Sequence, residues 1–335
     1  MGTDVTFLER HKSLIITGVA VAVAGSVAAA VIWAFATGHD RVQHGTGRAE
    51  AVVAQSGAKT GSGSGGAILV ASLRGANEVP VAGGPATGDK DGAALEFVRV
   101  EGDRVSVAAT WRGTGRPTML HIHQGPRGVN GGVKIDFGKL EKGVRGHTVV
   151  GTVKVADAAL LSRLKTDPGA FYANLHTAQF PGGAVRGQLH NVSTAFDFRH
   201  ALDNVQASVV KGRQISTCRP TPGGGYAFAQ RDVSALLGGG ILHSFVKPGT
   251  GVPQWVAPDH SAVTGAVLTK TSAGDGNIPE LDLKATQYGT HHGLLSDTAE
   301  ILRLNTVGGV APTGPCTPGA TVGVPYRADY VFVQK

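Results

Sequence analysis

The feature that most constrains the fold of this chain is a repeated alternation of apolar and polar residues that begins at Ala67. Short runs such as TMLHIHQ and FYANLHTA are separated by turns rich in glycine, proline, asparagine and aspartate. Successive side chains of a strand point to opposite faces, so this alternation predicts half-buried β-strands. Many short strands between such turns are typical of antiparallel sandwiches and barrels. We therefore predict a mainly β protein.

One segment of this region has the period of a helix instead. Residues 156–165 place Leu160, Leu161 and Leu164 on one helical face, and Asp167-Pro168-Gly169 ends the pattern. We expect this helix to pack over one end of an antiparallel β-sandwich.

Changes in composition divide the chain into five parts. We expect a cytoplasmic head over residues 1–13, an apolar segment over 14–37, a flexible linker over 38–66, and two β-rich domains over 67–195 and 196–335. The glycine- and serine-rich linker has no hydrophobic periodicity and cannot bury enough surface to fold. The roughly 270 residues that follow it are enough for two domains with cores of their own.

The apolar segment is long enough to cross a membrane. Residues 14–36 are 23 positions without a charge, which as a helix cover the hydrocarbon thickness of a bilayer. Arg10 and Lys12 precede it, which favours a cytoplasmic N-terminus and export of the rest. Ala34-Phe35-Ala36 also fits a signal-peptidase site. We therefore expect either a membrane anchor with extracytoplasmic domains or, after cleavage behind Ala36, a secreted protein.

Charge gives no sign of a nucleic-acid partner. The formal net charge is +7, but lysine and arginine are scattered singly along the chain. Basic modules that bind nucleic acid cluster these residues on one element or interleave them with aromatic residues. We expect a solvated, mildly basic surface and no nucleic-acid binding.

Two cysteines, Cys218 and Cys316, both lie in the second β-rich domain. In an exported chain an even pair favours a disulfide. A bridge that closes a loop of about 100 residues stabilises the domain by up to roughly 4 to 5 kcal/mol on the chain-entropy model. Export and the cysteine pair are therefore mutually consistent predictions.

Four stretches of the first β-rich domain occur in the order and spacing of a known family. They are LRGANEVP at 73–80, HIHQGP at 121–126 with GVNG at 128–131, YANLHT at 172–177, and FPGGAVRGQL at 180–189. With them, residues 68–190 resemble the CHRD domain, a chordin-type module found in many exported bacterial proteins. The resemblance implies a β-sandwich similar in look to copper-zinc superoxide dismutase, and a role in extracellular binding. Where the family commonly has a carboxylate near the last stretch, this chain has Ala184.

The second β-rich domain carries another set of shared stretches. They are QISTC at 214–218, GILH at 240–243, Trp255 before Asp259, RLNTVGGVAP at 303–312 with Cys316, and VPYRADY at 324–330. With them, residues 211–335 resemble a domain-of-unknown-function family of secreted bacterial and fungal proteins. Relatives usually have aromatic residues where this chain has Ser244 and Glu280, so a pocket lined by those aromatics would be altered here.

Histidines of the first β-rich domain form the candidate site. Alternation places His121 and His123 on one face of their strand, while the residues between and before them point to the core. The same alternation places His176 on a second strand and His190 on a third. If these strands are neighbours, up to four imidazoles converge in a set suited to copper or zinc.

A structural role for the same histidines is the competing interpretation. His121, His123 and His176 would then form a hydrogen-bond network that braces the turns at residues 125–132 and 181–183. The histidine pair resembles the copper-binding strand of superoxide dismutases, but the sequence shows no long active-site loop of the dismutase kind. We therefore do not expect dismutase catalysis.

The second β-rich domain has polar candidates without a catalytic spacing. They are His243, Asp259, His260, His291 and His292. No serine there has the context of a nucleophile elbow. Trp255 and the tyrosines at 326 and 330 are expected in the core, where aromatic residues usually pack.

We therefore expect a non-enzymatic, membrane-anchored cell-surface protein that binds an extracellular protein or braces the envelope. One alternative is a copper or zinc metalloprotein that uses the histidine strand of the first β-rich domain. A second is an enzyme acting on a small molecule through residues 196–335, which requires an apolar pocket with convergent polar groups.

Overall fold

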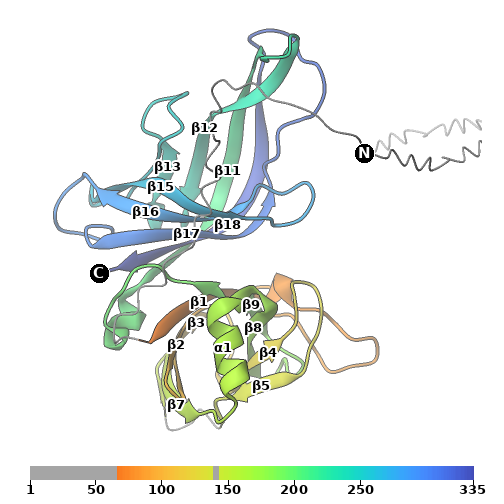
Figure 1. Cartoon of the computed structure of the whole chain (residues 1–335), viewed down its shortest axis with the longest axis vertical. Coiled ribbons are helices and arrows are strands. Elements are labelled where there is room, and N and C mark those ends of the chain that lie inside the picture. The colour runs from red at the N-terminus through yellow and green to blue at the C-terminus, as the bar shows by residue number, and fades with distance from the viewer. Residues whose placement is uncertain (1–65, 139–142) are drawn as a thin grey trace, which may run out of the picture. The chain divides into compact units, whose positions relative to one another are not determined.

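The chain folds mainly as antiparallel sheet, as its alternation predicts. The computed structural model describes residues 66–138 and 143–335. Its first sheet has ten strands in the order β5-β4-β8-β9-β1-β2-β3-β7-β6, with β10 paired to β1 (Figure 1). These strands are β1 (Ala67–Arg74), β2 (Ala93–Glu101), β3 (Arg104–Arg112), β4 (Pro117–Gln124), β5 (Val133–Asp136), β6 (Val144–Arg145), β7 (Thr148–Lys154), β8 (Phe171–Thr177), β9 (Val185–Gln188) and β10 (His190–Asn191).

This first sheet curls around a single core. Apolar side chains from strands near both ends of the sheet, such as Ile122 of β4 and Val149 of β7, belong to one buried cluster. The two layers expected of a sandwich are thus formed by one continuous, curled sheet. A sheet can do this because its strands twist with a fixed hand and the twist accumulates across many strands.

The predicted helix closes this core. Helix α1 (Ala158–Thr166) begins directly after its N-cap residue Asp157. The carboxylate of Asp157 accepts a hydrogen bond from Leu160 N at 2.9 Å. Such an N-cap satisfies one of the free amide groups of the first helical turn. The leucines at 160, 161 and 164 are buried in the core cluster of the sheet, which confirms the helical face predicted from the sequence.

The second β-rich domain is a closed barrel of eight strands (Figure 1). Each strand pairs with its neighbour in sequence, and β11 closes the ring by pairing with β18. The strands are β11 (Val205–Pro220), β12 (Tyr226–Leu237), β13 (Leu242–Phe245), β14 (Pro253–Val256), β15 (Ala262–Thr271), β16 (Glu280–Gln287), β17 (Thr298–Gly308) and β18 (Thr321–Gln334). Closure leaves no unpaired sheet edge.

Sheet and barrel share an apolar cluster. Val70 and Phe97 of the first sheet are buried with Leu302 and Val331 of the barrel. Phe198 of the connecting 3-10 helix η4 (Phe198–Asp203) belongs to the same cluster. The strands β1, β2, β17 and β18 are therefore covered on both faces. The described residues 66–138 and 143–335 accordingly belong to one compact unit.

Polar contacts reinforce this junction around one buried acid of the barrel. Asp329 accepts hydrogen bonds from Ser72 Oγ at 2.8 Å and from Arg74 Nε at 3.0 Å, both from β1. Asn305 Nδ2 of β17 also donates to it at 2.9 Å. Asp329 is only 3 % exposed, so these donors replace the water that the carboxylate loses on burial.

The predicted disulfide is present. Cys218 of β11 is bonded to Cys316 in the segment before β18, and the bridge closes a loop with a sequence separation of 98 residues. The bridge thus ties the first strand of the barrel to the chain that leads into the last one. It covalently supports the closure made by the β11–β18 pairing.

Replacing both cysteines with serine should lower the free energy of unfolding by about 4 kcal/mol, because the unfolded chain regains the entropy of that loop. Denaturant titration of both proteins measures this loss. The wild-type chain unfolded with reductant should show a similar loss. Equal midpoints in all three titrations would contradict the prediction.

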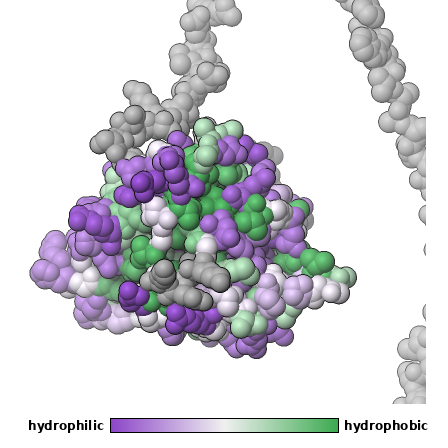
Figure 2. Space-filling model, turned by 90° about the horizontal axis from the view of Figure 1, so that it is seen from below, coloured by the Kyte–Doolittle hydropathy of each residue, from purple (hydrophilic) through white to green (hydrophobic). Residues whose placement is uncertain are grey.

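Polar and apolar residues are mixed on the surface. Figure 2 shows one face on which hydrophobic surface in green lies among hydrophilic side chains in purple. Several exposed apolar residues are single valines in strands, such as Val133 at 48 % and Val150 at 54 % exposure. Scattered apolar residues of this kind are normal for a protein surface.

The expected anchor at residues 14–37 and the linker at 38–66 lie outside the described residues. Within residues 66–138 and 143–335, no helix has the length and apolarity needed to span a membrane.

Candidate metal centre

Three of the four predicted histidines come together on two neighbouring strands. His121 and His123 lie on β4, and the residues that alternate with them, Leu120 and Ile122, are fully buried in the core. Strand β8 pairs antiparallel with β4 and brings His176 beside them. The strand alternation read from the sequence therefore places all three imidazoles on the same face of the sheet.

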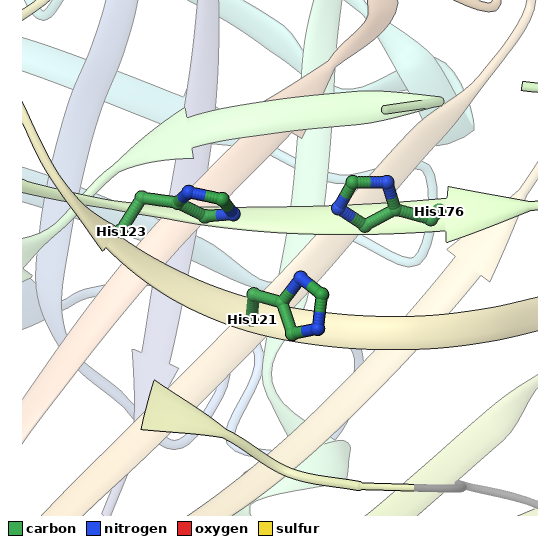
Figure 3. Close-up of side chains that lie close together, drawn as sticks. All are labelled: His121, His123 and His176. Atoms are coloured by element: carbon green, nitrogen blue, oxygen red, sulfur yellow. The ribbon is translucent and has the colours of Figure 1, made fainter. Parts of the chain in front are cut away.

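The three rings face one another closely (Figure 3). Ring centroids of His121 lie 5.5 Å from His123 and 5.0 Å from His176, and the last two are 6.3 Å apart. One nitrogen from each ring lies within 4.8 Å of the others, a spacing that a single metal ion can bridge. No other group of this kind occurs among the residues that the structure describes.

Two of the three histidines have one nitrogen hydrogen-bonded to the backbone, and the third lies near a carboxylate. His123 Nδ1 donates to the carbonyl oxygen of Gly131 at 2.9 Å, and His176 Nδ1 donates to that of Pro181 at 2.9 Å. The remaining ring, His121, has its Nε2 3.5 Å from a carboxylate oxygen of Asp136. An acceptor on one nitrogen fixes the tautomer and leaves a lone pair on the other.

The opposite nitrogens are buried without partners. They are His121 Nδ1, His123 Nε2 and His176 Nε2. Buried polar atoms in folded proteins nearly always have a hydrogen-bond partner, so three unpartnered ones facing each other need an explanation. The backbone contacts do brace both glycine-rich turns, as the structural interpretation holds. They use only two of the six ring nitrogens, and the three unpartnered ones have the geometry of a ligand set.

Electrostatics keep the three rings neutral. Burial lowers the pKa of His121, His123 and His176 below the ordinary value of 6.5, and the hydrogen bonds to Gly131 and Pro181 oppose this only in part. Neutral imidazole is the form that coordinates a metal. The lone pairs are therefore available at neutral pH.

A layer of stacked side chains supports the cluster. The ring of Tyr172 stacks on His123 with a centroid distance of 4.8 Å, and the guanidinium of Arg186 lies 3.5 Å from the centroid of Tyr172. Arg186 donates in turn to the carbonyl oxygens of Pro126 and Val129. These contacts fix the turn that holds His123.

The sequence pattern does not predict the buried carboxyl group that lies near the cluster. Glu78 accepts a hydrogen bond from Asn174 at 3.4 Å, and Asn174 is the β8 residue paired with His121. Burial raises the pKa of Glu78 to about 7, against the opposing effects of Arg186 and Asn174. Glu78 belongs to the first shared stretch of the sequence. It lies outside the strands, so the alternation of strand residues cannot predict where its side chain points.

His190, the fourth predicted ligand, is not part of the cluster. The antiparallel register pairs Asn174 with Arg186, which puts His176 level with Ala184. His190 is six residues further along, about 20 Å away at strand rise. Its Nε2 instead lies 3.6 Å from Glu280 of the barrel. Strand alternation gives the face on which His190 lies, but the register of β8 and β9 separates it from His176.

The polar candidates of the second β-rich domain do not converge either. His243 is buried inside the barrel, stacked on Trp255 at a centroid distance of 4.4 Å. Asp259 instead holds a loop by accepting hydrogen bonds from Ser261 and from Leu294 N. The side chains at 260, 291 and 292 are exposed.

The curled sheet with its histidine cluster and the closed barrel define a two-domain antiparallel β protein. Residues 69–189 match the CHRD domain, and residues 188–334 match the family described as protein of unknown function (DUF3455). The chain is thus a CHRD domain followed by a DUF3455 domain, as the shared stretches predicted. No curated protein and no solved structure matches it.

Proposed function

We propose that this chain is an exported, membrane-anchored binding protein whose CHRD domain holds a copper or zinc ion on His121, His123 and His176. The observation that carries the proposal is the set of three buried, unpartnered imidazole nitrogens within 4.8 Å of one another. A metal ion would satisfy all three at once. A water molecule has two hydrogens and could donate to only two of them.

Ligand chemistry favours copper or zinc over other ions. Imidazole nitrogen suits both metals, whereas calcium and magnesium prefer oxygen. Three protein ligands leave a coordination position open. In a binding protein, that position would accept a donor atom from an extracellular ligand. The oxygens of Gly131, Pro181 and Asp136 lie at the ring nitrogens that would not bind the metal. Oxygens in this position orient metal-bound histidines in other proteins.

Export is supported by two separate features. The uncharged segment at residues 14–36 has the length of a membrane span. The Cys218–Cys316 bridge fits an oxidising compartment, because disulfides rarely persist in the cytosol. Retention in the membrane would be lost if the chain were cleaved behind Ala36, and N-terminal sequencing of the mature protein distinguishes the two forms.

Metal analysis tests the proposal directly. The purified full chain, dialysed against copper or zinc and then freed of excess metal, should retain about one ion per chain. A His121→Ala, His123→Ala variant should retain only trace metal, because one imidazole cannot hold the ion alone. With copper, the wild-type electron paramagnetic resonance spectrum should show nitrogen coupling that the variant lacks.

His190→Ala is the matched control, because it removes a histidine of the same domain that lies outside the cluster. It should retain metal like the wild-type chain. Trace metal in the wild-type chain would contradict the proposal, as would equal metal in wild type and double variant.

A further inference from the structure

The interior of the barrel contains a cavity that the histidine cluster does not use. Its volume is about 470 Å³, within the range of small-molecule pockets in proteins. Exposed side chains at 267 and 270 of β15 and at 310 after β17 belong to its lining. The cavity therefore reaches solvent at this rim, and its walls are the inward side chains of the barrel.

The walls are largely apolar and aromatic. Trp255, Phe245, Leu281 and Leu283 line the cavity, and Trp255 is only 1 % exposed to solvent. A closed eight-stranded barrel is wide enough to hold one small ligand where its inward side chains do not fill it. The body of a matching ligand is therefore apolar.

The unused polar atoms of the lining are hydrogen-bond donors. Trp255 Nε1 and Gln214 Nε2 are buried without a partner, although both residues are at most 3 % exposed. The amide oxygen of Gln214 is already occupied, because Gln230 Nε2 donates to it at 2.6 Å. Two buried N–H groups thus lack an acceptor, which is costly unless a ligand supplies one.

A cation lies in the same lining. Arg303 of β17 points inward between Leu302 and Leu304, which face the first sheet. It is 9 % exposed, and its side chain donates to the carbonyl oxygen of Pro279 at 2.8 Å. Over the part of the chain that the structure describes, no carboxylate lies within ion-pairing distance of Arg303. A buried guanidinium ordinarily has an anionic partner.

We propose that the barrel cavity binds a small apolar carboxylate, with its anionic group at Arg303 and the free N–H groups of Trp255 and Gln214. The apolar body of the ligand would pack against the apolar walls. Its carboxylate would be the acceptor that the N–H groups and Arg303 lack. This site is independent of the metal site in the CHRD domain, so either proposal can fail alone.

Calorimetry with naphthalene-2-carboxylate and with naphthalene-2-methanol tests the site. The probes share an aromatic body and differ in charge. The full chain, purified in non-ionic detergent with detergent alone as the blank, should bind the carboxylate with one site per chain. Binding of the alcohol should be at least roughly tenfold weaker, since it cannot make the charge-assisted contact.

Arg303→Gln should weaken carboxylate binding roughly ten- to a hundredfold and leave alcohol binding little changed. Arg327→Gln makes the same substitution on an exposed arginine of β18 and should leave both affinities unchanged. Gln214→Met removes one N–H donor and leaves the charge of Arg303 in place, and it should also weaken carboxylate binding. This variant tests the proposal even if Arg303→Gln does not fold. Equal affinity for the two probes, no saturable binding, or unaltered binding by the folded variants would overturn the proposal.

Discussion

Replacing Glu96 with glutamine is expected to raise the free energy of unfolding at pH 7 by on the order of 3 kcal/mol. Glu96 of β2 is fully buried, and neither carboxylate oxygen has a hydrogen-bond partner among the described residues. Burial raises its pKa to about 8 from an ordinary value of 4.5. At pH 7 the folded chain must therefore hold a proton that the unfolded chain has released.

The pH dependence gives this effect its signature. A carboxyl group with a raised pKa favours the folded state fully below pH 4.5, and this contribution falls as the pH rises towards 8. The difference between Glu96→Gln and wild type should thus be small near pH 4.5, grow up to pH 8 and then level off. Denaturant titrations at several pH values measure it.

Glu101→Gln is the matched control, since Glu101 is an exposed acid at the end of the same strand. Its stability difference from wild type should not grow over this pH range. A Glu96→Gln difference that is flat with pH would show that the buried carboxyl group is not protonated in the folded protein.

Replacing Asp329 with alanine is expected to lower the free energy of unfolding by about 3 to 5 kcal/mol, the usual loss when one member of a buried ion pair is removed. Burial alone would raise the pKa of Asp329, but hydrogen bonds and the charge of Arg74, together with Asn305, bring it below 3.8. Alanine would leave the guanidinium of Arg74 and the hydroxyl of Ser72 without this acceptor. The loss arises at the junction of sheet and barrel.

Denaturant titration at neutral pH measures this loss. Asp103→Ala is a suitable comparison, because Asp103 pairs with Lys154 at 3.1 Å on an exposed hairpin. Exposed pairs contribute little, so that variant should unfold like the wild-type chain. Similar stability of both variants would indicate that the junction does not contribute to folding. The contribution of ionised Asp329 to the free energy of unfolding is present above pH 3.8 and is lost as the pH falls below that value.

Local patterns in the sequence predicted much of the fold. The alternation around His121 and His123 placed their neighbours in the core, and the leucines of residues 156–165 gave the helix. Both results depend only on the period of a strand or a helix, which is a local property. The disulfide followed from counting cysteines in a chain expected to be exported.

Register and burial on both faces could not be predicted in the same way. The separation of His190 from His176 follows from the pairing of β8 with β9, which alternation does not specify. Glu96 and Arg303 each resemble the polar residue of a half-exposed strand. They are buried because their strands are covered on both faces, by the core on one and by the other domain on the other. Tertiary contacts between distant segments decide such cases.

The apolar cluster shared by sheet and barrel crosses the sequence boundary between the two modules. The two family matches meet near residue 188, so by sequence the chain divides there into two modules. Phe97 and Val331, which lie on either side of that division, are nevertheless buried in one cluster. The physical domain border thus runs through a packed interior and not through a solvated linker. A chain that has only one of these modules must bury the same strand face against another part of the protein, or carry polar side chains there.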